Sequence, residues 1–276
     1  MGSGFTAGMI LGGAITATLG WRWVFDINVP IGVAVSLLSI KYISSTVGGI
    51  NYENRHLDIF GAVSVTAGLM LLVYSLNVAQ NIGIGSLETL ELLLLSVILL
   101  AAFLLIEYRS KAPLMPLGFV RRSSIFGANI VGLLQVAAFV AMVFILTNYL
   151  QQVLGYSALS AGLAFAPMGV VSLVVSGFLS ARLVNRFGVK PILISAMTLQ
   201  TIGYLLLSQI FLAESYFGLL VPLLVIAFAA GLGFTAINIA ALTGTRRGEE
   251  GLASGLINTS RQIGGPIGLA VLLTVA

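Results

Sequence analysis

The residues best suited to chemistry in this sequence lie inside apolar runs, where polar side chains are costly to keep. Asn258, Arg261 and Gln262 stand at positions i, i+3 and i+4 of one such run and therefore share one face of a helix. A functional role is the default hypothesis for an arginine within a membrane-spanning segment. The alternative is that Arg261 lies near a membrane surface and extends its head group to water. The sequence leaves both interpretations open.

A second polar stripe runs along another apolar segment, where Gln135, Met142 and Tyr149 repeat every seven residues. Aromatic and methionine surfaces adapt to varied ligands, so this stripe is suited to lining a cavity for bulky apolar cations. Packing in the core is the competing interpretation, and we favour it for Met142. The sequence thus predicts a substrate path lined by Gln135, Tyr149, Asn258, Arg261 and Gln262.

Other kinds of chemistry have little support. The chain has no cysteine and one histidine, which argues against thiolate and paired-histidine metal sites, so we expect no metal and no cofactor. Residues 231–236 are glycine-rich but lack the lysine and preceding strand of a phosphate-binding loop. We interpret the carboxylates near predicted helix ends as solvated groups and not as proton relays: Asp26, Asp58, Glu88, Glu91 and Glu107. We expect a protein that is not an enzyme.

The composition indicates which solvent surrounds most of the chain. Charged residues form 8% of the chain and hydrophobic residues 58%, whereas ordinary soluble domains are about 25% charged. That much apolar surface requires a lipid bilayer around most of the chain. The net charge is +4, but the basic residues lie between apolar runs and do not form one patch. No nucleic-acid partner is therefore expected.

The apolar runs predict an all-α polytopic membrane protein, because a membrane helix needs about 20 mostly apolar residues. Nine spans are predicted, at 3–20, 24–43, 58–79, 89–107, 125–149, 159–181, 190–210, 216–241 and 253–276. The stretch 114–122 is apolar with a basic end and is too short to cross, so it is predicted to lie at the membrane surface, between two helix bundles.

The lysines and arginines predict the orientation, since basic loops stay cytoplasmic. Eleven of the thirteen follow even-numbered spans: Lys41, Arg55, Arg109, Lys111, Arg121, Arg122, Arg182, Arg186, Lys190, Arg246 and Arg247. We therefore expect a multi-pass protein of the cell membrane whose N-terminus is cytoplasmic and whose C-terminus is outside.

Small residues predict helix contacts. Gly4, Gly8 and Gly12 lie four apart on one face of the first span, which allows another helix to approach closely. The sixth span carries a face of the same kind, with Gly162, Gly169 and Ser176 spaced by seven. A generic helix contact would explain both patterns.

The stretch LGGAITATLGWRWVFDINVPIG, residues 11–32, resembles the fifth-to-sixth helix region of major facilitator antiporters. It is most similar to the fourteen-spanner EmrB/QacA type of drug:proton antiporter. The resemblance makes Gly4, Gly8, Gly12 and Gly13 part of that family's antiporter motif. One departure is Met9, where the family has a proline, so the motif is incomplete.

The resemblance continues through 56–76, 148–169, 177–191 and 249–271. It implies that the nine spans correspond to helices five to thirteen, so the chain is expected to be a fragment without the N-terminal part. The implied organisation is a two-span remainder of the N-terminal bundle at 1–56, a central hairpin at 57–110 and a five-span C-terminal bundle at 111–276.

In the family, the basic loop after the tenth helix acts on the cytoplasmic gate through charge contacts. The corresponding residues are Gly177, Arg182, Arg186, Gly188 and Lys190, although a plain positive-inside loop would look the same. The resemblance implies export of small amphipathic drugs or toxic compounds, driven by the proton gradient through alternating access. Two alternatives remain, a transporter of sugars or organic anions and a truncated, transport-inactive membrane protein. We expect that this chain alone does not catalyse export.

Overall fold

The computed structural model describes residues 2–42, 58–110, 114–210, 216–246 and 248–275, and the regular elements within these ranges are all helical. The N-terminal part contains α1 (Gly2–Thr18), α2 (Trp23–Asp26), α3 (Asn28–Tyr42), α4 (Ile59–Ile82) and α5 (Leu87–Arg109). It is followed by α6 (Leu117–Val120), α7 (Ser123–Asn148), η2 (Tyr149–Val153), α8 (Ala158–Ala164), α9 (Ala166–Val174), η3 (Val175–Leu179), α10 (Ser180–Phe187), α11 (Val189–Ile210), α12 (Tyr216–Thr243) and α13 (Glu250–Val275), where η2 and η3 are π-helical.

Local sequence signals explain several helix ends. The side chains of Asp58, Ser86 and Ser157 cap α4, α5 and α8, each accepting a hydrogen bond from the backbone N–H three residues later. Gly83 and Gly188 follow α4 and α10 with φ angles of 90° and 87°, a conformation that favours glycine. The helices therefore begin and end where backbone polar groups find partners.

The all-α polytopic prediction is confirmed, and each predicted span corresponds to a helix or, in two cases, to a run of short helical segments. By length and apolarity, seven described segments qualify as membrane spans, not nine. The first predicted span falls short because α1 has 17 residues. The last, α13, has 26 residues but carries a polar stretch around Arg261 that lowers its apolarity.

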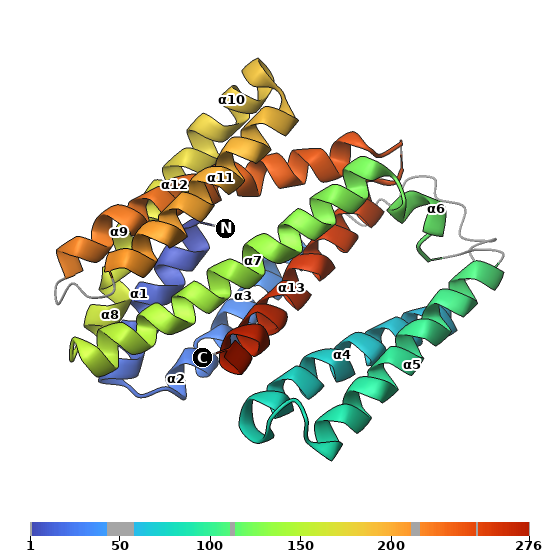
Figure 1. Ribbon diagram of the computed structural model, residues 1–276, viewed down its shortest axis with the longest axis horizontal. Helices are drawn as coiled ribbons and strands as arrows, with labels where there is room; N and C mark the ends of the chain where they lie inside the picture. The colour runs from blue at the N-terminus through green and yellow to red at the C-terminus, as the bar shows by residue number, and fades with distance from the viewer. Residues whose placement is uncertain (1, 43–57, 111–113, 211–215, 247, 276) are drawn as a thin grey trace.

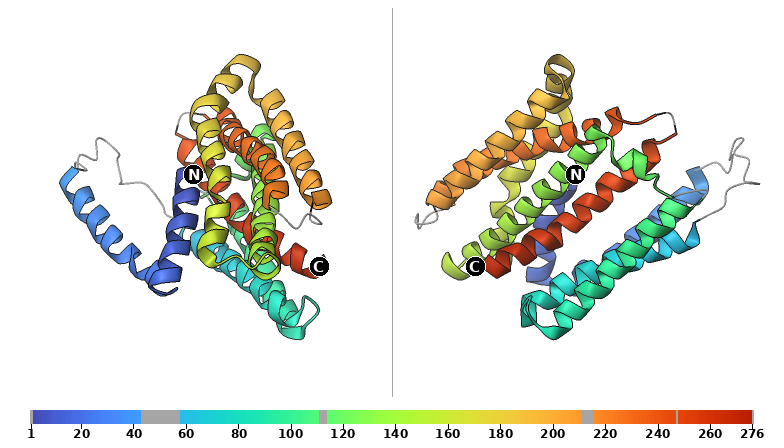
Figure 2. Two further views of the ribbon diagram at one scale, coloured as in Figure 1. Left: turned by 90° about the vertical axis from the view of Figure 1, so that its left-hand side faces the viewer. Right: turned by 45° about the vertical axis from the view of Figure 1, so that its right-hand side comes forward.

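The arrangement places α12 at the centre of a bundle (Figure 1). It packs against α7, α9 and α11, while α13 lies along α7 and the α4–α5 hairpin contacts α13 through α4. Helix α1 packs on α8 and α9, whereas α3 stands away from the bundle with no buried side chain (Figure 2).

The helix connections separate into two ends of this bundle (Figure 1). Helix α6, the α10–α11 turn and the α12–α13 loop lie at one end, and the α7–α8 connection lies at the other. The described parts of the predicted cytoplasmic loops after the fourth, sixth and eighth spans thus lie at a common end. Arg55, Lys111 and Arg247 lie outside the described residues.

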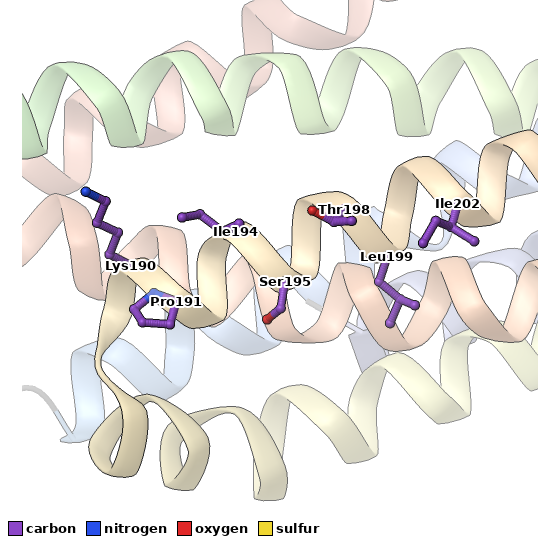
Figure 3. Close-up of a pocket in the computed structure, with 7 residues that line it drawn as sticks. All are labelled: Lys190, Pro191, Ile194, Ser195, Thr198, Leu199 and Ile202. Carbon is purple, nitrogen blue, oxygen red and sulfur yellow. The ribbon is translucent and has the colours of Figure 1, made fainter.

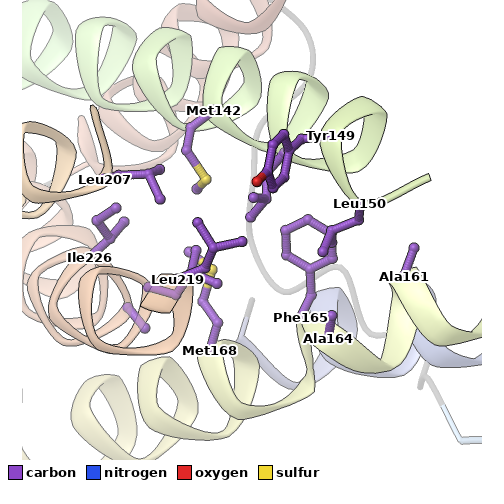
Figure 4. Packing of buried hydrophobic residues seen from close by; sticks show 13 residues of the cluster. Met142, Tyr149, Leu150, Ala161, Ala164, Phe165, Met168, Leu207, Leu219 and Ile226 are labelled. Atoms are coloured by element: carbon purple, nitrogen blue, oxygen red, sulfur yellow. The ribbon is translucent and has the colours of Figure 1, made fainter. Parts of the chain in front are cut away.

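Apolar packing closes the opposite end of the bundle. Figure 4 shows side chains from α7, α8, α11 and α12 converging there, and Leu146, Phe165 and Leu219 are almost completely buried. The phenol of Tyr216 donates a hydrogen bond of 2.8 Å to the carbonyl oxygen of Ala164, which joins α12 to α8. This end is a packed core, and the space that could receive a ligand lies deeper in the bundle.

Candidate functional site

A cavity of about 220 Å³ lies between α7, α9, η3, α12 and α13. Most of its lining is apolar, and polar side chains enter it from α7, α9, η3 and α13. The lining residues are Gln135, Val136, Phe139, Met168, Gly169, Ser172, Ser176, Ala227, Ala230, Phe234, Arg261 and Gln262. A mainly apolar cavity with a few convergent polar groups is typical of a small-molecule site.

Arg261 brings a positive charge into this lining. Its side chain is 4% exposed and lies against α12, where one terminal nitrogen donates to Oδ1 of Asn238 at 3.2 Å. The other donates weakly to the carbonyl oxygen of Phe234 at 3.4 Å, and the guanidinium carbon lies 4.4 Å from the centre of the Phe234 ring. The Nε atom is buried and has no hydrogen-bond partner among the described residues. The guanidinium is therefore held between helices and does not extend to water.

Gln135 enters the cavity from α7 as part of a chain of polar side chains. Its amide nitrogen donates to Gln200 of α11 at 3.3 Å, and Gln200 in turn donates to the phenol of Tyr204 at 2.8 Å. The chain passes α12 at Gly233, where an added Cβ would lie 2.6 Å from the Gln135 nitrogen. The missing side chain of Gly233 therefore makes room for a polar link from α7 to α11.

The predicted substrate path is only partly assembled. Gln135, Arg261 and Gln262 line the cavity, but Tyr149 and Asn258 do not. Tyr149, the first residue of η2, packs in the apolar core with Met142 of α7. Asn258 is exposed on α13. A role for these two residues in a substrate path stays a prediction.

The glycines of α1 differ in what they contact. An added Cβ at Gly13 would lie 3.1 Å from the carbonyl oxygen of Ala158, at the start of α8. At Gly8 and Gly12 the same atom would meet nothing within 4 Å, and Gly4 lies in the first turn of α1. The close approach to another helix therefore falls at Gly13, not on the predicted stripe, and a role in antiport stays a prediction for all four glycines.

The predicted gate residues surround the α10–α11 turn. Gly177 lies in η3, Gly188 ends α10, and the remaining three are exposed basic residues: Arg182, Arg186 and Lys190. Among the described residues these three form no ion pair, although Arg186 stacks 5.2 Å from the ring of Phe187. Their effect on a gate stays a prediction.

Lys190 also borders an open, apolar groove on the outer face of α11. Figure 3 shows this groove with Pro191 beside Lys190 and Ile194, Thr198 and Ile202 further along the helix. The groove lies on the surface of one helix, so nothing there encloses a small ligand.

The one ion pair of the described residues links the starts of α7 and α13. Arg122 binds Glu249 through two contacts, of 2.5 Å and 3.0 Å, and also donates to the carbonyl oxygen of Gly244 at 2.9 Å. The Arg122 guanidinium and the backbone N–H of Arg246 lower the pKa of Glu249 to about 2. The sequence predicted only that Arg122 is a basic loop residue, because two partners that lie 127 positions apart leave no local pattern.

Metal chemistry finds no support in the part of the chain that the structure describes. No group of three or more histidine, cysteine, aspartate or glutamate side chains comes together there. The cavity offers hydrogen bonding, aromatic surface and one positive charge, and these groups bind ligands without breaking bonds.

Known proteins resemble this chain along nearly its whole length. Residues 1–269 match the family model described as the Major Facilitator Superfamily. The cephamycin export protein CmcT of Amycolatopsis lactamdurans is 35% identical over 274 residues, which cover 99% of this chain and 56% of that protein. The puromycin resistance protein pur8 of Streptomyces alboniger is 32% identical over 284 residues, covering 100% of this chain and 54% of that protein.

A further similar protein is the multidrug resistance protein Stp of Mycobacterium tuberculosis. It is 31% identical over 273 residues, which cover 99% of this chain and 50% of that protein. The chain thus spans about half the length of the curated relatives it matches.

Proposed function

Since the chain belongs to the Major Facilitator Superfamily, we propose that it is part of an exporter of amphipathic antibiotics or toxic compounds. The family consists of membrane transporters, and the similar proteins bear names that refer to antibiotic export or drug resistance. Because the chain spans about half of those proteins, the proposal concerns the activity of the whole transporter.

The observation that carries this proposal is the cavity between α7, α9, α12 and α13. Phe139, Met168 and Phe234 give it apolar, adaptable walls, while Gln135 and Arg261 add donors. A sugar site needs many hydrogen-bonding groups, whereas this lining suits a molecule with a large apolar part and few polar groups. The lining therefore favours amphipathic substrates over sugars.

We further propose proton-coupled antiport by alternating access, in the manner of the EmrB/QacA-type transporters. The polar end with α6, the α10–α11 turn and the α12–α13 loop would face the cytoplasm, with the N-terminus inside and the C-terminus outside. The bundles of residues 1–56 and 111–276 would rock relative to each other, and the hairpin of 57–110 would lie between them in the sequence. No described carboxylate lines the cavity, so the proton-carrying group is expected outside it.

Transport in proteoliposomes tests the proposal. The chain, and separately the product of its gene extended upstream and downstream in phase, would be reconstituted with an imposed pH gradient. Uptake of ethidium would be compared with uptake of a radiolabelled sugar. We expect gradient-driven ethidium transport by the longer product and none by this chain alone. Sugar transport without ethidium transport would contradict the proposed substrate class, and ethidium transport by the chain alone would contradict its expected inactivity.

A further inference from the structure

The positive charge of Arg261 has no counterion in the part of the chain that the structure describes. The described carboxylates lie at or near helix ends, and none forms an ion pair with Arg261. Of the five N–H groups of the guanidinium, two donate to protein atoms, and both acceptors are neutral oxygens. An uncompensated charge at this depth is costly, so its retention requires an explanation.

The position of the guanidinium argues against the simplest explanation, which is that it reaches water. Arg261 lies near the middle of α13, and its head group contacts Asn238 and Phe234 inside the bundle. The Phe234 ring covers the guanidinium at 4.4 Å, and the side chain is 4% exposed. These contacts fix the orientation of the head group without neutralising its charge.

The cavity supplies the place where a neutralising group would fit. Arg261 and Gln262 line it from α13, Gln135 lines it from α7, and the remaining wall is mostly apolar. A guanidinium with unused donors beside an apolar wall favours a planar anion attached to an apolar body. A carboxylate meets this requirement, because its two oxygens can accept parallel N–H bonds.

We infer that Arg261 is a recognition residue for the acidic group of an amphipathic carboxylate bound in this cavity. This inference rests on the proposed function and deepens it, because it adds carboxylates to the amphipathic substrates, of which the sequence alone favoured bulky cations. The apolar body of the ligand lies against Phe139 and Met168, and its carboxylate meets the guanidinium that Asn238 and Phe234 orient.

Binding of a matched pair of fluorescent probes tests this inference. Dansylglycine carries a carboxylate, and dansylglycinamide has the same fluorophore with a neutral amide. Each would be titrated into the purified 276-residue chain in detergent micelles, with protein-free micelles as background. We expect the chain to bind dansylglycine at least about tenfold more tightly than dansylglycinamide. A desolvated ion pair with Arg261 strengthens binding of the carboxylate, whereas the neutral amide cannot form this pair.

Three variants separate recognition from structure. Arg261→Gln should abolish the preference for the carboxylate, and Arg261→Lys should retain part of it. Arg121→Gln, which removes an exposed positive charge elsewhere, should leave the preference unchanged. Circular dichroism would establish that each variant is folded. If Arg261→Gln does not fold, the comparison of the two probes in the unaltered chain still tests the preference for the carboxylate.

The outcomes distinguish this inference from the proposed function. Equal saturable binding of both probes would overturn carboxylate recognition, while a cavity for amphipathic molecules would stand. Saturable binding of neither probe would count against the cavity itself. A carboxylate preference that survives in Arg261→Gln would place the anion site elsewhere and would also overturn the inference.

Discussion

Arg122 and Glu249 join the start of α7 to the start of α13 through a two-contact ion pair, with their closest atoms 2.5 Å apart. The pair also orders the α12–α13 loop, because Arg122 donates to the carbonyl oxygen of Gly244 and Glu249 accepts from the backbone N–H of Arg246. The ion pair and these two hydrogen bonds therefore tie the start of α7 to the α12–α13 loop at this end of the bundle.

The low pKa of Glu249 predicts an acid-sensitive contribution to stability. Its pKa falls from the ordinary 4.5 to about 2 on folding, so the folded state binds fewer protons than the unfolded state between these values. The contribution is complete above pH 4.5 and is lost as the pH falls toward about 2. Thermal unfolding of the purified chain, followed by circular dichroism, should show a falling midpoint across this window. The fall should be smaller in Glu249→Gln and unchanged in Arg121→Gln, and an equal fall in Glu249→Gln would contradict the assignment.

Two glycines set the distance between α13 and α7. An added Cβ at Gly264 or Gly268 would collide with the carbonyl oxygens of Leu133 and Ala137, which lie four residues apart on α7. We expect Gly268→Ala to lower the free energy of unfolding by about 1–3 kcal/mol through overpacking. Gly255→Ala is a matched control on the same helix, because the added Cβ meets nothing within 4 Å there. Alanine favours a helix more than glycine does, so Gly255→Ala should retain or raise the stability. A loss of stability in Gly255→Ala as large as in Gly268→Ala would show that the contact with α7 is not responsible.

The sequence could predict the helices because their signals are local. Apolar runs, capping residues such as Ser86 and terminating glycines such as Gly188 act within a few positions of the helix ends. The polar character of Arg261 within such a run was equally visible, and the structure places this residue in the lining of the cavity. For these features, composition and spacing contain the physical cause.

The contacts between helices could not be predicted in the same way, because they depend on how each helix is rotated about its axis and on which neighbour approaches it. A stripe repeating every seven residues predicted that Tyr149 would follow Gln135 into the cavity, but Tyr149 packs with Met142 in the core formed with α8, α11 and α12. The regular spacing of Gly8 and Gly12 likewise gave no sign that α8 would approach at Gly13.

The contact at Gly13 predicts different effects for two adjacent glycines. Gly13→Val should disturb the packing of α1 on α8, because even a Cβ would lie 3.1 Å from the carbonyl oxygen of Ala158. Gly12→Val places the same side chain in open space, with the same change in helix propensity. We expect a lower thermal unfolding midpoint for Gly13→Val than for Gly12→Val. Equal midpoints would mean that the approach of α1 to α8 contributes little to stability.

The carboxyl group of Glu107 in the α4–α5 hairpin gives the last prediction. Glu107 is 3% exposed, so the interpretation of this group as solvated was wrong, and it accepts a hydrogen bond from the backbone N–H of Met115. Its other oxygen and one oxygen of Asp58 are buried and have no hydrogen-bond partner among the described residues. A buried carboxyl oxygen without a partner is costly to keep.

Glu107→Gln replaces the unpartnered carboxyl oxygen with an N–H donor, and the remaining amide oxygen can still accept from Met115. The donor lies near the carboxyl group of Asp58, which has a free oxygen. We expect the variant to raise the free energy of unfolding by about 1 kcal/mol, in line with the gain of one satisfied hydrogen bond. Glu91→Gln, an exposed position on the same helix, should have little effect in the same thermal unfolding measurement. A lower midpoint for Glu107→Gln would contradict this prediction and would show that the hairpin depends on the carboxyl group.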